Sequence, residues 1–382
     1  MTDDFSEIRP YNNEELSDAI EKVLNDESFL TFVHQFKPQM TKEQLAALFH
    51  QMHTTFDVHR LCGFPLLKWL EDNKTDGLTF SDFNKVTLPT LFISNHRDIV
   101  VDPAFLNYIL MSNHINTTEI GIGDNLLVSK WLQVFVRMAK CFIVQRSLPP
   151  REMPRALMQL SAYIRYVILE KQSSIWIAQR EGRAKDSDDR TQESILKMFA
   201  ISGDGSFIDN LKALNISPVT ISYEYDPCDF LKAKEFQQKR DNQDFKKSIA
   251  DDVLSMKTGI LGFKGCVHYA FAPSINADLD TIALQTANKK EQVSAVARVI
   301  DRQIHRNYII YPINKVAYDC LLGSKRFESE YTADEKTAVL HYFDSQVAKI
   351  DLQNADIPFL RHKILEMYAN PLINFLVAHD NE

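Results

Sequence analysis

The middle of the chain alternates short apolar runs with longer amphipathic stretches. The apolar runs are rich in β-branched and aromatic residues and too short for helices, so they predict buried strands. These runs are residues 87–93, 175–178, 219–223 and 266–271. Between them, stretches such as residues 151–170 and 191–201 have helical spacing. The alternation predicts an α/β fold, in which a mixed, mostly parallel sheet is flanked by helices.

Both ends of the chain have helical patterns. Thr41 and Thr332 each begin a Ser/Thr-x-x-Glu/Gln capping box, which is typical of the first turn of a helix. We therefore expect helical N- and C-terminal extensions around the α/β domain. The predicted division is a helical N-terminal region at residues 1–86, an α/β domain at residues 87–322 and a helical C-terminal region at residues 323–382.

The composition narrows the classes of partner. The chain has 382 residues, of which 45% are apolar and 25% charged, and its formal net charge is −8. An acidic chain lacks the basic excess of a generic nucleic-acid binder, so we expect no nucleic-acid partner. The five cysteines are far apart and form no Cys-x-x-Cys pair. Neither a disulfide framework nor a zinc site is therefore expected, and a reducing cytosol fits best.

Targeting and membrane signals are also absent from the sequence pattern. The first ten residues are acidic and polar, unlike the basic start and apolar centre of a secretory signal. No uncharged apolar run reaches about 18 residues, the length of a membrane-spanning helix. We expect a cytoplasmic protein that meets lipid only from the surface, peripheral on the inner face of the cell membrane.

Candidate chemistry begins directly after the first predicted strand. The strand that ends at Ile93 delivers Asn95 and His96 to its carboxyl end, where open α/β sheets place their ligand sites. A histidine there can act as a general base, and a carboxylate on its other ring nitrogen would fix the tautomer. Asp98 and Asp102 are both close enough in sequence to be that carboxylate. Asp102 followed by Pro103 is also a typical helix start, which needs no function.

Three further segments carry chemistry downstream. An apolar run at residues 142–145 ends in Arg146, whose guanidinium could reach a phosphate or carboxylate. The predicted strand at residues 175–178 opens into a turn with Glu181, Gly182 and Arg183, which would allow an anionic group to approach closely. Another strand has Pro218 at its entry, which is typical of the edge of a sheet.

Together and in this order, these four segments resemble the motif set of the glycerol-3-phosphate and lysophosphatidate acyltransferase superfamily. The family pattern is N-H-x4-D, an apolar pair with x-R, then E-G-x-R, then V-P-V or similar. Residues 265–273 resemble the family's late strand, with Ala272 in place of a glycine, and residues 299–322 look like the tail of the glycerol-3-phosphate acyltransferase branch. The resemblance covers roughly residues 87–322.

The chain departs from the family pattern in two blocks. Five residues rather than four separate His96 from Asp102, and the third block is Glu-Gly-Arg without a spacer. A bulge or a loop must absorb the added residue, because the side chains would otherwise leave a common helix face. These departures indicate a divergent member of the superfamily.

The resemblance implies direct acyl transfer from acyl-CoA or an acyl carrier protein thioester to a hydroxyl of glycerol 3-phosphate or a lysophospholipid. His96 would accept the hydroxyl proton and Asp102 would orient His96. Arg146, Glu181, Gly182 and Arg183 would bind the acceptor's phosphate. No cofactor beyond the acyl thioester co-substrate and no metal is implied.

Residues 126–143 bear on contact with a membrane surface. Lys130, Arg137 and Lys140 recur at helical spacing beside an apolar face with Trp131 and Phe135. This pattern is typical of an interfacial helix, and a core helix with one solvated edge has the same pattern.

Three other hypotheses remain open at the level of sequence. The acceptor could be a lyso-aminolipid, because an arginine binds a carboxylate as well as a phosphate. A metal hydrolase could use His96, Asp98 and Asp102 as ligands. A lipid-binding module without activity would also fit the altered spacings.

The segment Gly121-Ile122-Gly123-Asp124 is too short for a nucleotide loop and predicts a turn.

Overall fold

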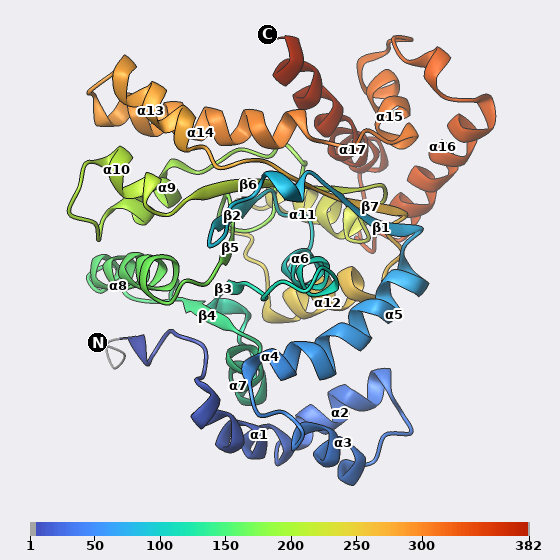
Figure 1. Ribbon diagram of the computed structural model, residues 1–382. Coiled ribbons are helices and arrows are strands. Elements are labelled where there is room, and N and C mark those ends of the chain that lie inside the picture. The colour runs from blue at the N-terminus through green and yellow to red at the C-terminus, as the bar shows by residue number, and fades with distance from the viewer. Residues whose placement is uncertain (1–4, 381–382) are drawn as a thin grey trace.

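The computed structural model describes residues 5–380 and shows, within them, a seven-stranded sheet (Figure 1). The strand order is β1-β7-β6-β2-β5-β3-β4. All neighbouring strands are parallel except β6 and β7, which are antiparallel. The predicted mixed, mostly parallel α/β fold is therefore confirmed. The strands are β1 (Gly77–Ser81), β2 (Leu91–Ser94), β3 (Glu119–Gly123), β4 (Cys141–Val144), β5 (Ile175–Ala178), β6 (Ile216–Tyr223) and β7 (Cys266–Phe271).

The sequence predicted β2, β5, β6 and β7 but did not predict β1 and β3 as strands. β5 and β7 have the predicted bounds, whereas β2 begins later and β6 earlier than expected. β1 lies in the region predicted to be helical, and the prediction was wrong there because this short edge strand is half polar and partly exposed. β3 was predicted as a turn. Its Gly121 is a packing residue instead, since a Cβ there would lie 3.1 Å from the Phe142 ring.

Pro218 was expected at a sheet edge, but β6 lies inside the sheet between β7 and β2. The antiparallel ladder explains how the proline is tolerated. The Pro218 carbonyl accepts from the Ala272 N–H at 2.9 Å, and the return bond to the Ala272 carbonyl cannot come from a proline nitrogen. The Ser217 hydroxyl donates to that carbonyl at 2.5 Å instead. A neighbouring side chain thus replaces the missing backbone donor.

Helices cover both faces of the sheet, as the layers in Figure 1 show. One face packs mainly against α5, α6 and α12 and the other against α8, α9, α10, α13 and α14. The first set is α5 (Phe64–Lys74), α6 (Val101–Ser112) and α12 (Ile249–Leu261). The second set is α8 (Met153–Arg165), α9 (Glu193–Ala200), α10 (Phe207–Lys212), α13 (Asn276–Gln285) and α14 (Lys289–Arg306).

The two ends of the chain form separate helical clusters (Figure 1). The N-terminal cluster packs against α7 (Lys130–Met138). Its helices are α1 (Leu16–Leu24), α2 (Glu27–Phe36), α3 (Lys42–Phe49) and α4 (Thr55–Val58). The C-terminal cluster consists of α11 (Asp229–Asp241), α15 (Pro312–Leu322), α16 (Ala333–Ala348) and α17 (Ile357–Asp380). The capping boxes predicted at Thr41 and Thr332 are both formed. The predicted division into three regions stays a prediction.

The apolar face of α7 packs against protein. The Trp131 ring lies 5.2 Å from the Phe29 ring and 5.0 Å from the Phe32 ring, both on α2. Arg137 lies over the Tyr11 ring and donates to the backbone carbonyls of Ser6 and Arg9. Of the predicted stretch at residues 126–143, Lys130–Met138 is helical and is packed on one side by the N-terminal cluster, whereas Lys140 lies after the helix. Within residues 5–380, no helix has the length and apolar character needed to cross a membrane.

Candidate active site

His96 and Asp102 form the centre of the site. His96 Nδ1 lies 2.8 Å from Asp102 Oδ2, and the His96 side chain is 12% exposed whereas that of Asp102 is fully buried. His96 follows β2 at the carboxyl end of the strand, and Asp102 lies in the first turn of α6. Within residues 5–380, His96 Nε2 makes no hydrogen bond, so this nitrogen can accept a proton from outside.

The loop between the two residues explains how the extra spacer residue is absorbed. It is not helical, and it wraps around the carboxylate of Asp102. The backbone N–H groups of Arg97 and Asp98 donate to Asp102 Oδ2 at 2.6 and 3.0 Å. Because the loop closes on the carboxylate, five intervening residues bring His96 to the same oxygen.

Two tyrosines fix the other side of Asp102. The Tyr223 hydroxyl donates to Asp102 Oδ1 at 2.9 Å, and the Tyr269 hydroxyl donates to the Asp102 carbonyl at 2.8 Å. Tyr223 comes from β6 and Tyr269 from β7. A carboxylate with donors on both oxygens is held in one orientation, as a residue that orients a histidine must be.

Asp98, the alternative partner, has a different role. Its Oδ1 accepts from the N–H groups of Val100 and Val101, so it caps the start of α6. Burial raises the pKa of Asp98, and the nearby Asp102 carboxylate raises it further. Its Oδ2 faces Gly259 of α12, where a Cβ would lie only 1.7 Å away. The geometry thus gives the contact with His96 to Asp102.

The residues before and beside His96 hold its backbone and ring. The Asn95 side chain is fully buried and bridges to β6, donating to the Ile221 carbonyl at 2.9 Å and accepting from its N–H at 2.8 Å. The Trp176 ring meets the His96 ring edge-on at 5.6 Å between centroids. Trp176 is itself fixed by a bond from its indole nitrogen to Ser94. The histidine therefore sits on rigid strand ends.

Arg146 and Glu181 lie together beyond the carboxyl ends of β4 and β5. Arg146 follows β4 and its guanidinium is 3.7 Å from the Glu181 carboxylate, with side chains 35% and 66% exposed. Asp124 accepts from the Arg146 N–H at 3.1 Å, which fixes the backbone. Gly182 has a φ of +66°, a left-handed conformation that favours glycine. Glu181 and Gly182 thus form an exposed turn, and Arg146 lies beside it.

Arg183 points into a different environment. It lines a small hollow between α11 and α12 with Lys232, Lys234 and Lys247, while Glu235 and Asp251 are the acidic residues there. Burial acts to lower the pKa of Arg183, but nearby ionisable groups that include Asp98 and Asp226 raise it overall. Its Nη1 is buried and has no hydrogen-bond partner within residues 5–380. Arg183 therefore lines the hollow and has one buried donor without a partner among residues 5–380.

The structure does not join all the predicted anion-binding residues. Arg146 is linked to Glu181, whereas Arg183 is turned toward α11 and α12, and within residues 5–380 no contact connects the two arginines. Lys232 connects the hollow to the His96 loop, because it pairs with Asp226 and donates to the Arg97 carbonyl at 3.2 Å. The hollow has a volume of about 30 Å3, which is room for about two water molecules, so it does not enclose a lipid.

Several residues of the site escaped sequence reasoning. Tyr223 and Tyr269 reach Asp102 only because β6 lies beside β2 and β7 beside β6, and nothing local marks them. Arg97 forms a buried ion pair with Asp189 at 2.8 Å. Its position directly after His96 was the one available signal, since a charged residue next to a candidate base invites a search for its partner.

The geometry does not favour the metal-hydrolase hypothesis. Both Asp102 oxygens already accept hydrogen bonds, and Asp98 caps a helix, so His96, Asp98 and Asp102 do not present free ligands to one point. Among residues 5–380, no group of three or more His, Cys, Asp or Glu side chains has the arrangement of a metal site.

Comparison with known protein families relates this part of the chain to one of them. Residues 79–222 match the family model described as Acyltransferase. The matched stretch contains His96, Asp102, Arg146 and the Glu181–Gly182–Arg183 turn, so the superfamily resemblance is confirmed for this part of the chain. The chain therefore contains an acyltransferase-family domain.

The comparison with curated proteins gave no match. Among solved structures, the chain is similar to the crystal structure of the 1-acyl-sn-glycerophosphate (LPA) acyltransferase PlsC from Thermotoga maritima. The identity is 10%, the match covers 76% of this chain and 94% of that chain, and the TM-score is 0.36.

Proposed function

We propose that this protein transfers a fatty acyl group from an acyl thioester, acyl-CoA or acyl carrier protein, to a hydroxyl of glycerol 3-phosphate or a lysophospholipid. His96 acts as the general base and Asp102 orients it. One observation carries the proposal: within an acyltransferase-family domain, His96 is bound to a buried, fully hydrogen-bonded Asp102 while its Nε2 stays available.

The reaction follows from this pair. His96 Nε2 removes the proton of the acceptor hydroxyl as its oxygen attacks the thioester carbonyl. Asp102 holds the neutral tautomer with a proton on Nδ1 and stabilises the imidazolium that forms. When the tetrahedral intermediate collapses, the C–S bond breaks and the imidazolium returns the proton to the leaving thiolate. An ester and a free thiol result, and no covalent acyl-enzyme forms.

The arginines give the proposal its acceptor class. Arg183 has a buried donor without a partner and lies among three lysines, which favours an anionic group such as a phosphate. Arg146 is more exposed and is partly neutralised by Glu181. We therefore assign the main anion contact to Arg183 and a supporting role to Arg146, Glu181 and Gly182. The competing acceptor is a lyso-aminolipid, whose carboxylate would bind the arginine in place of a phosphate.

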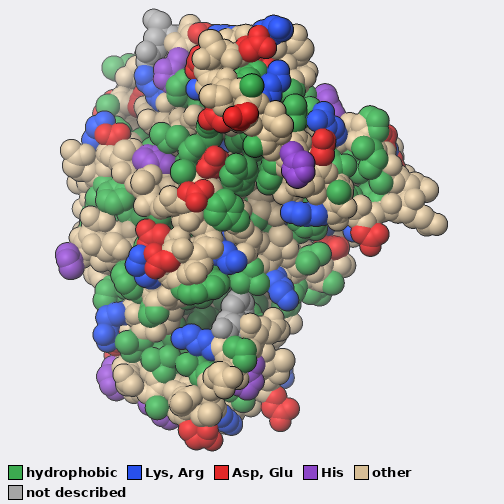
Figure 2. Space-filling view, turned by 90° about the vertical axis from the view of Figure 1, so that its right-hand side faces the viewer, with side chains coloured by type: hydrophobic (Ala, Val, Ile, Leu, Met, Phe, Trp, Pro, Cys, Tyr) green, Lys and Arg blue, Asp and Glu red, His purple; other side chains and the backbone are tan. Residues whose placement is uncertain are grey.

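A lipid acceptor implies contact with a membrane surface, and α12 is the element that supports it. Ile249, Val253 and Leu254 of α12 are 63%, 42% and 48% exposed. Leu254 also lines the hollow that contains Arg183, so the apolar surface borders the anion site. On the face in Figure 2, acidic and basic side chains are interspersed among hydrophobic patches. Attachment would then rest on apolar side chains, such as those of α12, and not on a broad basic surface.

The test is an acyl-transfer assay with identification of products by mass. The protein is incubated with labelled acyl-CoA or acyl carrier protein thioester and a panel of glycerol 3-phosphate, lysophosphatidate and lyso-aminolipid acceptors. We expect an acyl ester of a phosphate-bearing acceptor. His96→Ala should abolish it, whereas His341→Ala, at an exposed position of α16, should leave the rate unchanged.

Two results would overturn the proposal. If no donor and acceptor pair gives an acyl product, the enzyme hypothesis fails. If His96→Ala transfers acyl groups at the normal rate, the activity exists but the proposed mechanism is wrong.

A further inference from the structure

The loop that continues from Arg183 to α9 is anchored by a buried ion pair. The Arg97 guanidinium lies 2.8 Å from Asp189 Oδ2, with side chains 6% and 0% exposed. Tyr308 touches both partners: its hydroxyl donates to Asp189 Oδ2 at 2.5 Å and accepts from Arg97 Nη2 at 3.2 Å. The guanidinium also lies over the Tyr308 ring at 5.6 Å. One tyrosine therefore holds together residues from two loops of the site.

Side chains of α17 also hydrogen-bond to this loop. Asn370 donates to the Asp186 carbonyl at 2.8 Å. Asn374, one turn further along, donates to Asp188 Oδ1 at 3.1 Å and accepts from Arg190 at 3.0 Å. Residues four apart share one face of a helix, so both amides point at the loop.

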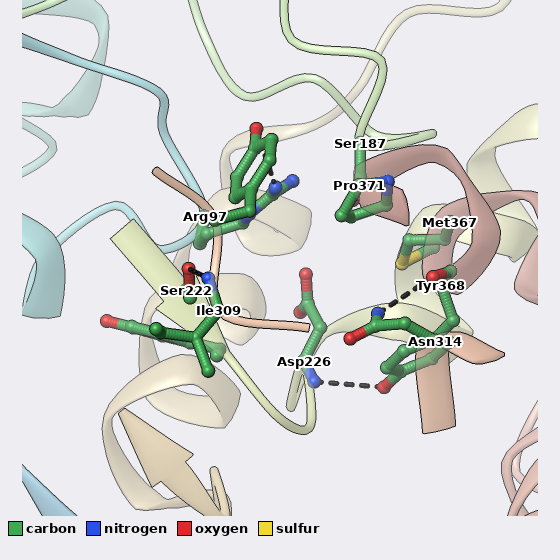
Figure 3. A pocket seen from close by; sticks show the side chains of 11 residues that line it. Arg97, Ser187, Ser222, Asp226, Ile309, Asn314, Met367, Tyr368 and Pro371 are labelled. Atoms are coloured by element: carbon green, nitrogen blue, oxygen red, sulfur yellow. Dashed lines mark hydrogen bonds between the residues drawn. The ribbon is translucent and has the colours of Figure 1, made fainter. Parts of the chain in front are cut away.

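A cavity of about 20 Å3 separates these two anchors (Figure 3). Figure 3 shows Arg97 on one side of it and Met367, Tyr368 and Pro371 of α17 on the other. The volume is room for about one water molecule, so the cavity is part of the interior and not a substrate site. Arg97 and α17 are thus closely packed, with room for about one water molecule between them.

The anchors act on both halves of the active site. The Arg97 N–H donates to the same Asp102 oxygen that faces His96, so the Arg97 backbone shapes the His96–Asp102 pair. At the other end, the anchored loop begins at Arg183. A buried ion pair contributes little net stability, because desolvation offsets the attraction, but breaking one leaves an unpaired charge. The Arg97–Asp189 pair is therefore suited to holding the two loops in one relative position.

We propose that Tyr308 and the Asn370–Asn374 face of α17 form a positioning clamp, which holds the loop after Arg183 against the His96 loop. The clamp lies outside the matched stretch of residues 79–222, so it gives the C-terminal part of the chain a role in the site. This inference rests on the proposed acyl transfer for its catalytic effect. The clamp itself is a property of the folded chain and can be measured without substrate.

Hydrogen exchange on the full-length protein tests the clamp directly. Tyr308→Phe keeps the ring and removes both hydroxyl contacts. We expect the exchange rate to rise on the order of tenfold in residues 95–102 and 183–191. The exchange rate in α14 should stay unchanged, except in its last turn. Asn374→Ala should raise exchange only in residues 183–191. Tyr318→Phe is the matched control, since this ring packs on Phe327 and its hydroxyl has no hydrogen bond within residues 5–380.

Kinetics then separate positioning from general stability. We expect Tyr308→Phe to lower kcat about tenfold at a temperature where the variant is fully folded, and Asn374→Ala to raise KM for the acceptor severalfold with kcat within twofold. Unchanged exchange in residues 95–102 of Tyr308→Phe would overturn the clamp, and so would equal effects in the Tyr318→Phe control. A wild-type protein without acyl transfer would overturn the proposed function, while the exchange result would still decide the clamp.

Discussion

The Tyr223 hydroxyl donates to Asp102 Oδ1 at 2.9 Å, on the oxygen opposite the one that faces His96. Both residues are buried, and the bond links β6 to the first turn of α6. The carboxylate cannot rotate away from the histidine without breaking this bond and those from the Arg97 and Asp98 N–H groups.

The first prediction separates the two candidate carboxylates. Asp102→Asn should lower kcat about a thousandfold or more, because an amide favours the wrong His96 tautomer. Tyr223→Phe should lower it about tenfold by loosening the same carboxylate. Asp98→Asn keeps an acceptor oxygen for the α6 cap, so it should retain most of the activity. Steady-state rates with melting temperatures measure all three. A larger loss in Asp98→Asn than in Asp102→Asn would reverse the assignment.

The second prediction concerns the arginines. Arg183→Ala should raise KM for a phosphate-bearing acceptor by about tenfold to a hundredfold, the loss of a charge-assisted contact, and Arg183→Lys should restore part of it. Arg146→Ala should have a smaller effect, because Arg146 is exposed and faces Glu181. Arg155→Ala, on the exposed side of α8, is the control. Equal KM values in the Arg183 and Arg155 variants would remove Arg183 from the site.

The third prediction tests α12 as the lipid-facing element. An Ile249→Ser/Val253→Ser variant should bind vesicles of phosphatidylglycerol and phosphatidylethanolamine at least tenfold more weakly, since each apolar side chain contributes roughly 1.5 kcal/mol or more on burial. Leu284→Ser is the matched control, because Leu284 is 90% exposed on α13. Co-sedimentation measures binding. If the control weakens it equally, α12 has no special role.

The fourth prediction follows from a buried carboxyl in the C-terminal cluster. Burial raises the pKa of Asp229 to about 7, and the neighbouring Asp226 adds to this. The folded state therefore binds more protons than the unfolded state between pH 3.8 and 7. Consequently, the free energy of unfolding should fall as pH rises through this window and level off above it.

Asp229→Asn isolates this contribution. Tyr342 and Tyr368 each donate to Asp229 at 2.8 Å, and an amide oxygen can keep accepting from them. Relative to the wild type, the variant should gain about 2 kcal/mol between pH 5 and pH 8. Urea unfolding at several pH values measures the difference. A difference that does not change with pH would show that Asp229 does not titrate in this range.

The sequence by itself determined the elements whose burial can be inferred from the local pattern of apolar residues. β5 and β7 have their predicted bounds, because runs buried on both faces are readable without neighbours. It also placed His96 at the carboxyl end of a strand, and the order of the motifs identified the superfamily. These features depend on residues close together in the chain.

Only the tertiary structure decided which groups meet at the site. Asp98 and Asp102 are both close to His96 in sequence, and the choice between them depends on a loop without periodicity that closes on one carboxylate. β1 and β3 escaped because an edge strand and a glycine-containing strand lack the expected apolar pattern. Tyr308 reaches Arg97 across 211 residues. Contacts of that range leave no local signal, because the sheet order and helix packing that create them come from the whole chain.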